Sequence, residues 1–159
     1  MKLVARNTLI ALMFVICAAE LRAEPIPDRF GLAIHCINTV YERVRTAAGI
    51  KEEWELVILP AGRHKACVLN GKVLFSYKFI RTLHHTDELA CVMGHEFAHI
   101  KLGHLESLKH GNTVEADADY LGYIYAKQAG YNPDVCEFLT KNDFPVERIH
   151  QVRLLLAKR

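Results

Sequence analysis

The sequence lacks a strong excess of charge of either sign, internal repeats and low-complexity linkers. Its formal net charge is only +2 at pH 7, and removal of the first 23 residues would leave equal numbers of basic and acidic side chains. Nucleic acids and anionic membranes attract basic proteins, so neither is expected as a partner. The length of 159 residues and the lack of a linker indicate one globular domain, which we expect over residues 24–159.

The N-terminus also lacks an apolar run of full membrane-spanning length. Lys2 precedes an apolar run over residues 8–19, and a polar stretch with two prolines begins at Glu24. A spanning helix needs about 20 apolar residues, whereas a secretory signal is basic, then apolar for a shorter distance. We expect residues 1–23 to be a signal peptide, so that the mature chain is periplasmic or secreted and has left the membrane. An uncleaved N-terminal anchor is the alternative.

No pair of cysteines has the CxxC spacing that is typical of a cysteine metal site. Four cysteines follow the expected signal peptide, and an even number in an exported chain permits two disulfides of undetermined pairing. Some of them could instead be buried thiols. Cys91 has apolar neighbours in the sequence, and a buried thiol is the expectation there. The four residues are Cys36, Cys67, Cys91 and Cys136.

Apolar periodicity and turn residues predict an α+β fold, with a small sheet followed by a helical bundle. Strands are expected at residues 55–59, 66–69 and 72–76, the last two joined by an Asn70-Gly71 turn. Helices are expected at residues 30–48, 79–83, 88–102, 114–129, 134–141 and 146–157, with Thr86 as the cap of the third.

The main functional signal is a His-Glu-x-x-His sequence in the helix expected at residues 88–102. His95 and His99 lie one turn apart on the same face, so both imidazoles can reach one zinc ion, and Glu96 stands beside the water that the ion activates. The sequence could occur by chance. However, the rest of this helix is apolar nearly all round, which predicts burial, and buried polar groups must be paired or bound to metal. We therefore predict one zinc ion, with Glu96 as the catalytic base.

A catalytic zinc site needs a third protein ligand. His104 is a weak candidate, because it follows the helix stop at Gly103 and is expected on a different bearing from the two ligand histidines. Glu115 is the better candidate. Asp119 lies one turn later on the same face and could accept the outer N–H of a ligand histidine. Alternatively, Glu115 forms a helix capping box with Asn112.

Two stripes of small residues predict that the helices carrying these groups pack closely. Small side chains let two helix backbones approach, and ligands from two helices can meet at one ion only if the helices are close. Ordinary helix packing would produce the same pattern. The stripes are Ala90, Gly94 and Ala98 on the first helix, and Ala118, Gly122 and Ala126 on the second.

Together these motifs resemble peptidase family M48, a family of gluzincin zinc metallopeptidases. The matching segments are His95–His99, Gly103-His104, Glu115–Asp119 and the two short strands around Asn70-Gly71. The resemblance implies a zincin-like fold, and it implies that residues 72–76 form the edge strand on which a peptide substrate pairs. It implies the same roles as the residues themselves: zinc on His95, His99 and Glu115, Glu96 as base, and Asp119 behind a histidine.

The C-terminal part departs from the family pattern, because a His-Pro pair that many members carry before a Glu-Arg-Ile segment is missing. Arg148, in the segment that is present, could stabilise an oxyanion, or it could form a surface salt bridge. We expect a zinc endopeptidase with protein or peptide substrates. The alternatives are an envelope chaperone or binding module that keeps zinc but cleaves little, and a structural zinc domain. Glu96 argues against the first and the three-ligand set against the second.

Overall fold

The computed structural model describes residues 30–60, 65–107, 111–136 and 145–158. The expected signal peptide, residues 1–23, lies outside these ranges. Among the described helices, none is both long enough and apolar enough to cross a membrane. The elements are α2 (Phe30–Ala47), β1 (Glu55–Leu59), β2 (Ala66–Leu69), β3 (Lys72–Ser76), α3 (Tyr77–Ile80), α4 (Thr86–Lys101), α5 (His104–Ser107), α6 (Asn112–Gln128), the 3-10 helix η1 (Pro133–Val135) and α8 (Val146–Ala157).

The predicted α+β class is confirmed, and the three strands have the predicted bounds. Several helix ends differ. The short helix expected at residues 79–83 begins directly after β3, at Tyr77. Helix α4 is capped at His85 rather than Thr86, because the Glu88 carboxylate accepts the backbone N–H groups of His84 and His85. A helix was expected at residues 134–141, but the described part holds only η1, and residues 137–144 lie outside the description.

The three strands form one sheet in the order β1-β3-β2. The Asn70-Gly71 turn pairs β2 antiparallel with β3, and β1 pairs parallel with the other side of β3. The expectation that residues 72–76 form an edge strand is therefore wrong. Val73 and Phe75 of β3 are fully buried, which suits a central strand. The edges of this sheet are β1 and β2, and of these β2 packs against α4.

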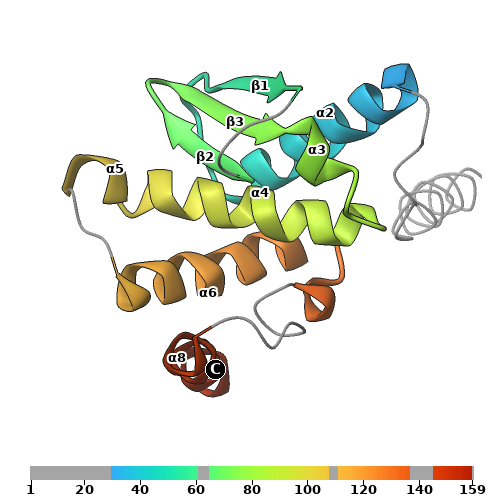
Figure 1. Cartoon of the computed structure of the whole chain (residues 1–159). Helices are drawn as coiled ribbons and strands as arrows, with labels where there is room; N and C mark the ends of the chain where they lie inside the picture. The colour runs from blue at the N-terminus through green and yellow to red at the C-terminus, as the bar shows by residue number, and fades with distance from the viewer. Residues whose placement is uncertain (1–29, 61–64, 108–110, 137–144, 159) are drawn as a thin grey trace, which may run out of the picture.

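Helix α4 lies in the middle of the molecule, with the sheet on one side and α6 on the other (Figure 1). Its apolar side chains Leu89, Met93 and Phe97 are fully buried and join the core formed with α2 and β3. Burial on several sides explains why this helix is apolar nearly all round. The helix that carries the His-Glu-x-x-His sequence is thus a rigid central element.

Helices α4 and α6 cross with their backbones in direct contact at Gly94 and Gly122. A Cβ atom added to Gly94 would lie 2.5 Å from the carbonyl oxygen of Gly122, and one added to Gly122 would lie 2.6 Å from the amide nitrogen of His95. Neither position can carry a side chain while the two helices stay this close. The alanines of both predicted stripes are fully buried around the crossing: Ala90, Ala98, Ala118 and Ala126.

A second, smaller core fixes the C-terminal part of the chain to α4 and α6. It contains Ala116 of α6, Val152 of α8 and a disulfide between Cys91 and Cys136. Cys91 is buried as predicted, at 6% exposure. It is not a thiol, however, because it forms the disulfide with Cys136. Cys91 lies on the side of α4 that faces η1, where Cys136 ends the turn with a Cα–Cα distance of 5.5 Å.

The second disulfide that the even count permitted does not form between the other two cysteines. Cys36 lies on α2 and Cys67 on β2, and both are half-buried thiols. Cys67 lies on β2, the edge strand that packs against the His-Glu-x-x-His helix.

Candidate metal centre and active site

The side chains of His95, His99 and Glu115 converge on one point between α4 and α6. The Nε2 atoms of the two histidines are 2.9 Å apart. The Glu115 carboxylate closes the triangle, with Oε2 3.4 Å from His95 Nε2 and Oε1 3.6 Å from His99 Nε2. Within the described ranges, this is the group of His, Cys, Asp and Glu side chains that could hold a metal ion.

The donor set and its spacing fit a tetrahedral metal ion. Nitrogen and oxygen ligands at the usual zinc distance of about 2.0–2.1 Å stand roughly 3.3 Å from one another in a tetrahedron. The two distances to Glu115 match this value, and the two histidines are slightly closer. Three protein ligands leave one tetrahedral position for water or substrate, which is the pattern of catalytic rather than structural zinc sites.

Glu115 faces the histidines and does not cap its own helix. Helix α6 is capped by Gly111, without a side-chain hydrogen bond, and Asn112 is the first helical residue. The capping box that the sequence left open between Asn112 and Glu115 is therefore not formed. The hydrogen bond from His95 is the largest of the effects that lower the pKa of Glu115, to about 2, so this carboxyl stays ionised.

Asp119, one turn after Glu115, binds the outer nitrogen of His95. Its Oδ1 lies 2.9 Å from His95 Nδ1, and the carboxylate is almost fully buried, at 3% exposure. Because Nδ1 is occupied in this way, Nε2 is the nitrogen of His95 that faces the Glu115 carboxylate. A carboxylate at this place fixes the tautomer and orientation of a ligand histidine.

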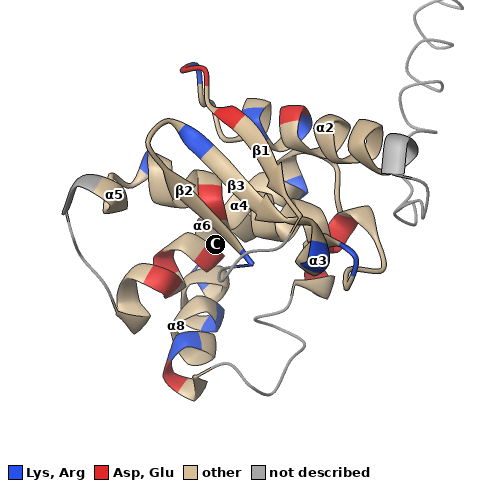
Figure 2. Ribbon diagram, turned by 45° about the horizontal axis from the view of Figure 1, so that its top comes forward, with Lys and Arg blue, Asp and Glu red and all other residues tan. Residues whose placement is uncertain are grey.

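Arg148 of α8 clamps the same carboxylate from the opposite side. Its Nε donates to Asp119 Oδ2 at 2.5 Å, its Nη2 donates to Asp119 Oδ1 at 2.7 Å, and its Nη1 lies 3.5 Å from Glu115 Oε2. The Arg148 side chain is only 14% exposed, so the surface salt bridge is wrong as a description. Figure 2 shows the acidic positions of α6 beside the basic positions of α8. No local pattern in the sequence indicates this pairing, because the two residues are 29 positions apart.

Glu96 lies between the two histidines in the sequence and is 7% exposed. Burial raises the pKa of this carboxyl to about 7, and the positive charge of His95 lowers it in part. Burial also raises the pKa of the Cys67 thiol, with a further contribution from the negative charge of Glu96. The edge strand β2, which carries Cys67, packs against α4, which carries Glu96.

His104 does not belong to the converging group, yet it is not directed away from the site. Its Nδ1 lies 2.9 Å from Nδ1 of His99, and the two rings meet edge to face. The expectation that His104 is a poor ligand agrees with the set of possible metal ligands, which does not include it. The contact of His104 with the outer nitrogen of His99 was not predicted. The sequence signal that pointed to this contact is the Gly103-His104 pair.

The model of peptidase family M48 matches residues 35–114, which is half of the chain. The chain belongs to peptidase family M48. The matched range covers the sheet, α4 and α5, and it ends one residue before Glu115. A comparison with curated proteins found no match. Membership of family M48 supports peptidase activity, which is a hydrolase reaction on protein or peptide substrates, and the His-His-Glu group gives this peptidase a place for a metal ion.

The two histidines of the converging group in this M48 peptidase have opposite electrostatic surroundings. Burial lowers the pKa of His95, but hydrogen bonds with Asp119 and Glu115 outweigh it and raise the pKa to about 9. Burial, followed by the charge of His95, lowers the pKa of His99 to about 4. In the metal-free protein His95 is therefore the histidine of this pair that holds the additional proton more strongly.

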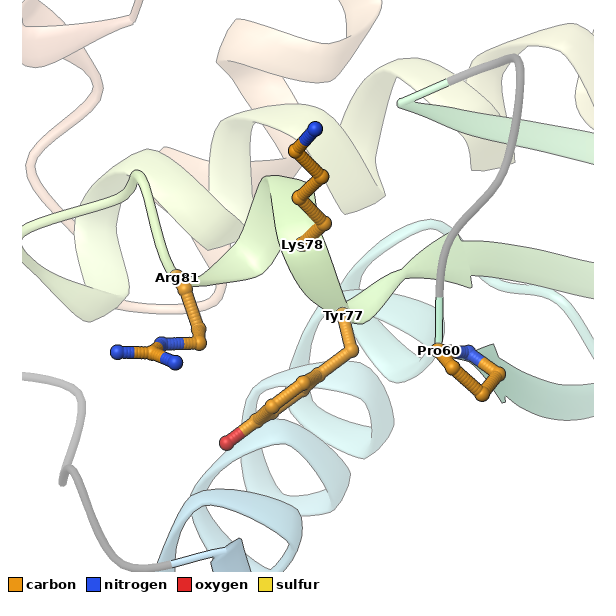
Figure 3. Close-up of a pocket in the computed structure, with 4 residues that line it drawn as sticks. All are labelled: Pro60, Tyr77, Lys78 and Arg81. Atoms are coloured by element: carbon orange, nitrogen blue, oxygen red, sulfur yellow. The ribbon is translucent and has the colours of Figure 1, made fainter.

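The M48 site does not share its residues with a separate pocket near the sheet. That pocket, of about 510 Å³, is lined by Pro60, Tyr77, Lys78 and Arg81. Figure 3 shows that Lys78 points to the opposite side of α3 from Tyr77 and Arg81. The two basic groups do not converge, and the pocket has no evident role in the chemistry at α4.

Proposed function

We propose that this M48 peptidase is a zinc-dependent endopeptidase with a zincin-like catalytic domain. The observation that carries the proposal is the convergence of His95 Nε2, His99 Nε2 and the Glu115 carboxylate within 4.8 Å of one another, next to the buried Glu96. A pure binding protein would not need a carboxyl group at position 96 with a pKa near neutrality. The zinc-binding chaperone therefore stays the second candidate.

In this proposal His95, His99 and Glu115 hold the ion. Bound zinc would supply a lowered water pKa and a polarising charge for the scissile carbonyl. Glu96 accepts the proton of the attacking water on a carboxylate oxygen and then donates it to the leaving amine nitrogen. Asp119 and Arg148 keep His95 in the tautomer that presents Nε2.

The substrate is proposed to be an extended polypeptide that adds to the edge of the sheet at β2. Strand addition uses main-chain hydrogen bonds and leaves the side-chain sequence of the substrate largely unrestricted. Two observations support β2: β3 is central in the sheet, and β2 is the edge strand that packs against α4. A peptide bound there would run past Glu96.

We propose that the protein works outside the cytoplasm, in the periplasm or after secretion, on envelope or secreted proteins. The support is the signal-like sequence of residues 1–23 together with the Cys91–Cys136 disulfide. Disulfides of this kind persist in oxidising compartments and are rare in the cytosol.

The proposal is tested with three variants, a quenched peptide substrate and a zinc determination. Glu96→Gln should keep one zinc ion per chain and lose nearly all turnover, because the amide accepts no proton. Glu115→Ala should lose both zinc and turnover. Asp117→Asn is the matched control, since it changes a half-buried carboxylate of α6 that has no part in the site, and it should behave as wild type.

Near-wild-type turnover of a pure Glu96→Gln preparation would refute the assignment of the base and favour the chaperone. A wild-type protein that takes up no zinc, even when zinc is supplied during refolding, would refute the proposal as a whole. Turnover that survives a strong chelator would do the same.

A further inference from the structure

The two ligand histidines are not supported in the same way on their outer faces. His95 has Asp119 at its Nδ1, a partner that the sequence already suggested. Among the residues that the structure describes, none places a carboxylate at the corresponding nitrogen of His99. Its Nδ1 instead faces Nδ1 of His104 at 2.9 Å, a hydrogen-bond distance between two imidazoles.

The protonation of this pair follows from the chemistry of the site. A histidine that gives its Nε2 lone pair to a metal carries its proton on Nδ1, so His99 must donate at Nδ1. The atom opposite, Nδ1 of His104, must then accept, which places the proton of a neutral His104 on its Nε2. His104 is therefore suited to accept from His99, just as Asp119 accepts from His95.

The end of α4 is shaped to allow this contact. Helix α4 ends at Lys101, and Gly103 has a positive φ of 65°. Residues other than glycine rarely adopt this backbone conformation. Its amide N–H donates to the carbonyl of Ile100. The chain turns at Gly103, so that α5 begins at His104 and the His104 imidazole contacts His99 in the last turn of α4.

We propose that His104 is a positioning residue for the metal centre, one that fixes the tautomer and ring orientation of His99 without binding the ion. The inference rests on the zinc site of the proposed function and adds a residue to it. His104 contacts His99 at the nitrogen that faces away from Glu115, and the possible ligand atoms are those of His95, His99 and Glu115. Its effect is thus expected on metal affinity and geometry.

Three substitutions at position 104 separate an acceptor from a space-filling side chain. Asn places an amide oxygen at about the position of the imidazole Nδ1, so His104→Asn should keep the hydrogen bond. His104→Gln moves the amide one carbon further, and His104→Leu fills space without an acceptor. The loss of such an outer partner typically costs about 10- to 100-fold in metal affinity. We expect this loss for Leu, a partial loss for Gln, and an affinity within a few-fold of wild type for Asn.

The measurements are zinc affinity by competition with a chromophoric chelator and the visible absorption spectrum of the cobalt-substituted protein. The Leu variant should still bind one ion per chain at saturation, with a shifted cobalt spectrum, and Asn should restore the wild-type spectrum. Circular dichroism and the melting temperature of the metal-free variants report on folding. A folded Leu variant with wild-type affinity and spectrum would overturn the proposal.

Two other outcomes would also overturn it. Complete loss of zinc at saturation in both the Leu and the Asn variants would make His104 a direct ligand. Equal weakening in the Asn and Leu variants would show that the acceptor is not what matters. If wild-type protein itself bound no zinc, the proposed function would fail first, and the two failures are thereby distinguished.

Discussion

Two contacts hold α6 in place, and they differ in kind. At the α4–α6 crossing, two backbones touch directly at Gly94 and Gly122. One turn earlier on α6, α8 reaches Asp119 through the long side chain of Arg148. Direct backbone contact fixes the distance between the two helices. A guanidinium on a flexible side chain instead neutralises and orients the carboxylate that it binds. We infer that the crossing decides whether the metal ligands meet and that α8 decides how well they are oriented.

The largest effect is expected from Gly122→Val, which disrupts the backbone contact between α4 and α6. The added side chain would meet backbone atoms of Gly94 and His95, so the helices must separate. Overpacking costs about 1–3 kcal/mol where side chains can yield, and we expect the upper end of that range or more here. Melting temperature and zinc content should both fall sharply. The exposed substitution Gln128→Ala, on the same helix, is the control, and unchanged zinc affinity in Gly122→Val would contradict the inference.

A smaller effect is expected from Arg148→Met, which removes the ion pair between α8 and Asp119. The variant keeps an unbranched side chain but leaves Asp119 buried without its guanidinium. Loss of one partner from a fully buried ion pair costs about 3–5 kcal/mol, and we expect about 2 kcal/mol because His95 still contacts Asp119. Zinc affinity should fall about 10-fold. The double variant Arg148→Met/Asp119→Asn should regain part of the stability. No regain in denaturant titrations would count against the pairing.

A pH titration of the metal-free protein sharpens the comparison at Asp119, the residue that α4, α6 and α8 share. The pKa of His95 is raised from 6.5 to about 9, so its proton stabilises the fold fully below pH 6.5 and less as the pH rises towards 9. The pKa of Glu96 is about 7, so most of its ionisation is complete at higher pH and it contributes little to the change in stability there. Stability should therefore fall between about pH 7 and 9.

Zinc must displace the same proton, so its apparent affinity should rise over the same interval. Asp119→Asn should shift both changes to lower pH, because it removes one of the hydrogen bonds that raise the pKa of His95. Thermal melts of metal-free protein and chelator competition at several pH values measure the two effects. A melting temperature that rises from pH 7 to 9 would show that the proton is not held on His95.

The smallest effect on the metal is expected from the double variant Cys91→Ser/Cys136→Ser. The disulfide secures η1, which precedes α8 in the chain, and touches none of the metal-facing groups. Closure of a loop of this length stabilises a fold by about 4 kcal/mol in the chain-entropy view. We expect a lower melting temperature with zinc affinity within a few-fold of wild type. Loss of zinc affinity as severe as in Gly122→Val would show that α8 matters as much as the crossing.

Local patterns predicted most of the elements and the converging residues. Strand bounds followed from alternation and the Asn70-Gly71 turn, and the metal-facing group followed from the spacing of His95, His99 and Glu115. The helix crossing also had a local signal, because small residues at every fourth position mark a face where backbones can touch. Within each helix these signals come from residues one or two turns apart, such as His95 with His99 and Glu115 with Asp119.

The features that were missed depend on residues that only the fold brings together. The central place of β3 depends on the pairing of β1, which nothing in the strand sequences specifies. The disulfide required the choice of one partner for Cys91 across 45 residues. The contact of His104 with His99 depends on the backbone direction after Gly103, because a residue with positive φ turns the chain in a way that helix periodicity does not describe.

The Cys91–Cys136 bond also turns the centre of the chain into a covalent ring. The ring contains His95, Glu96, His99, His104, Glu115 and Asp119, whereas Arg148 lies outside it. A single cut of the backbone inside the ring would leave both pieces joined, with every metal-facing group in one molecule. For a peptidase surrounded by other peptidases, or by copies of itself, such a ring would let a nicked chain retain its catalytic machinery for as long as the disulfide stays oxidised.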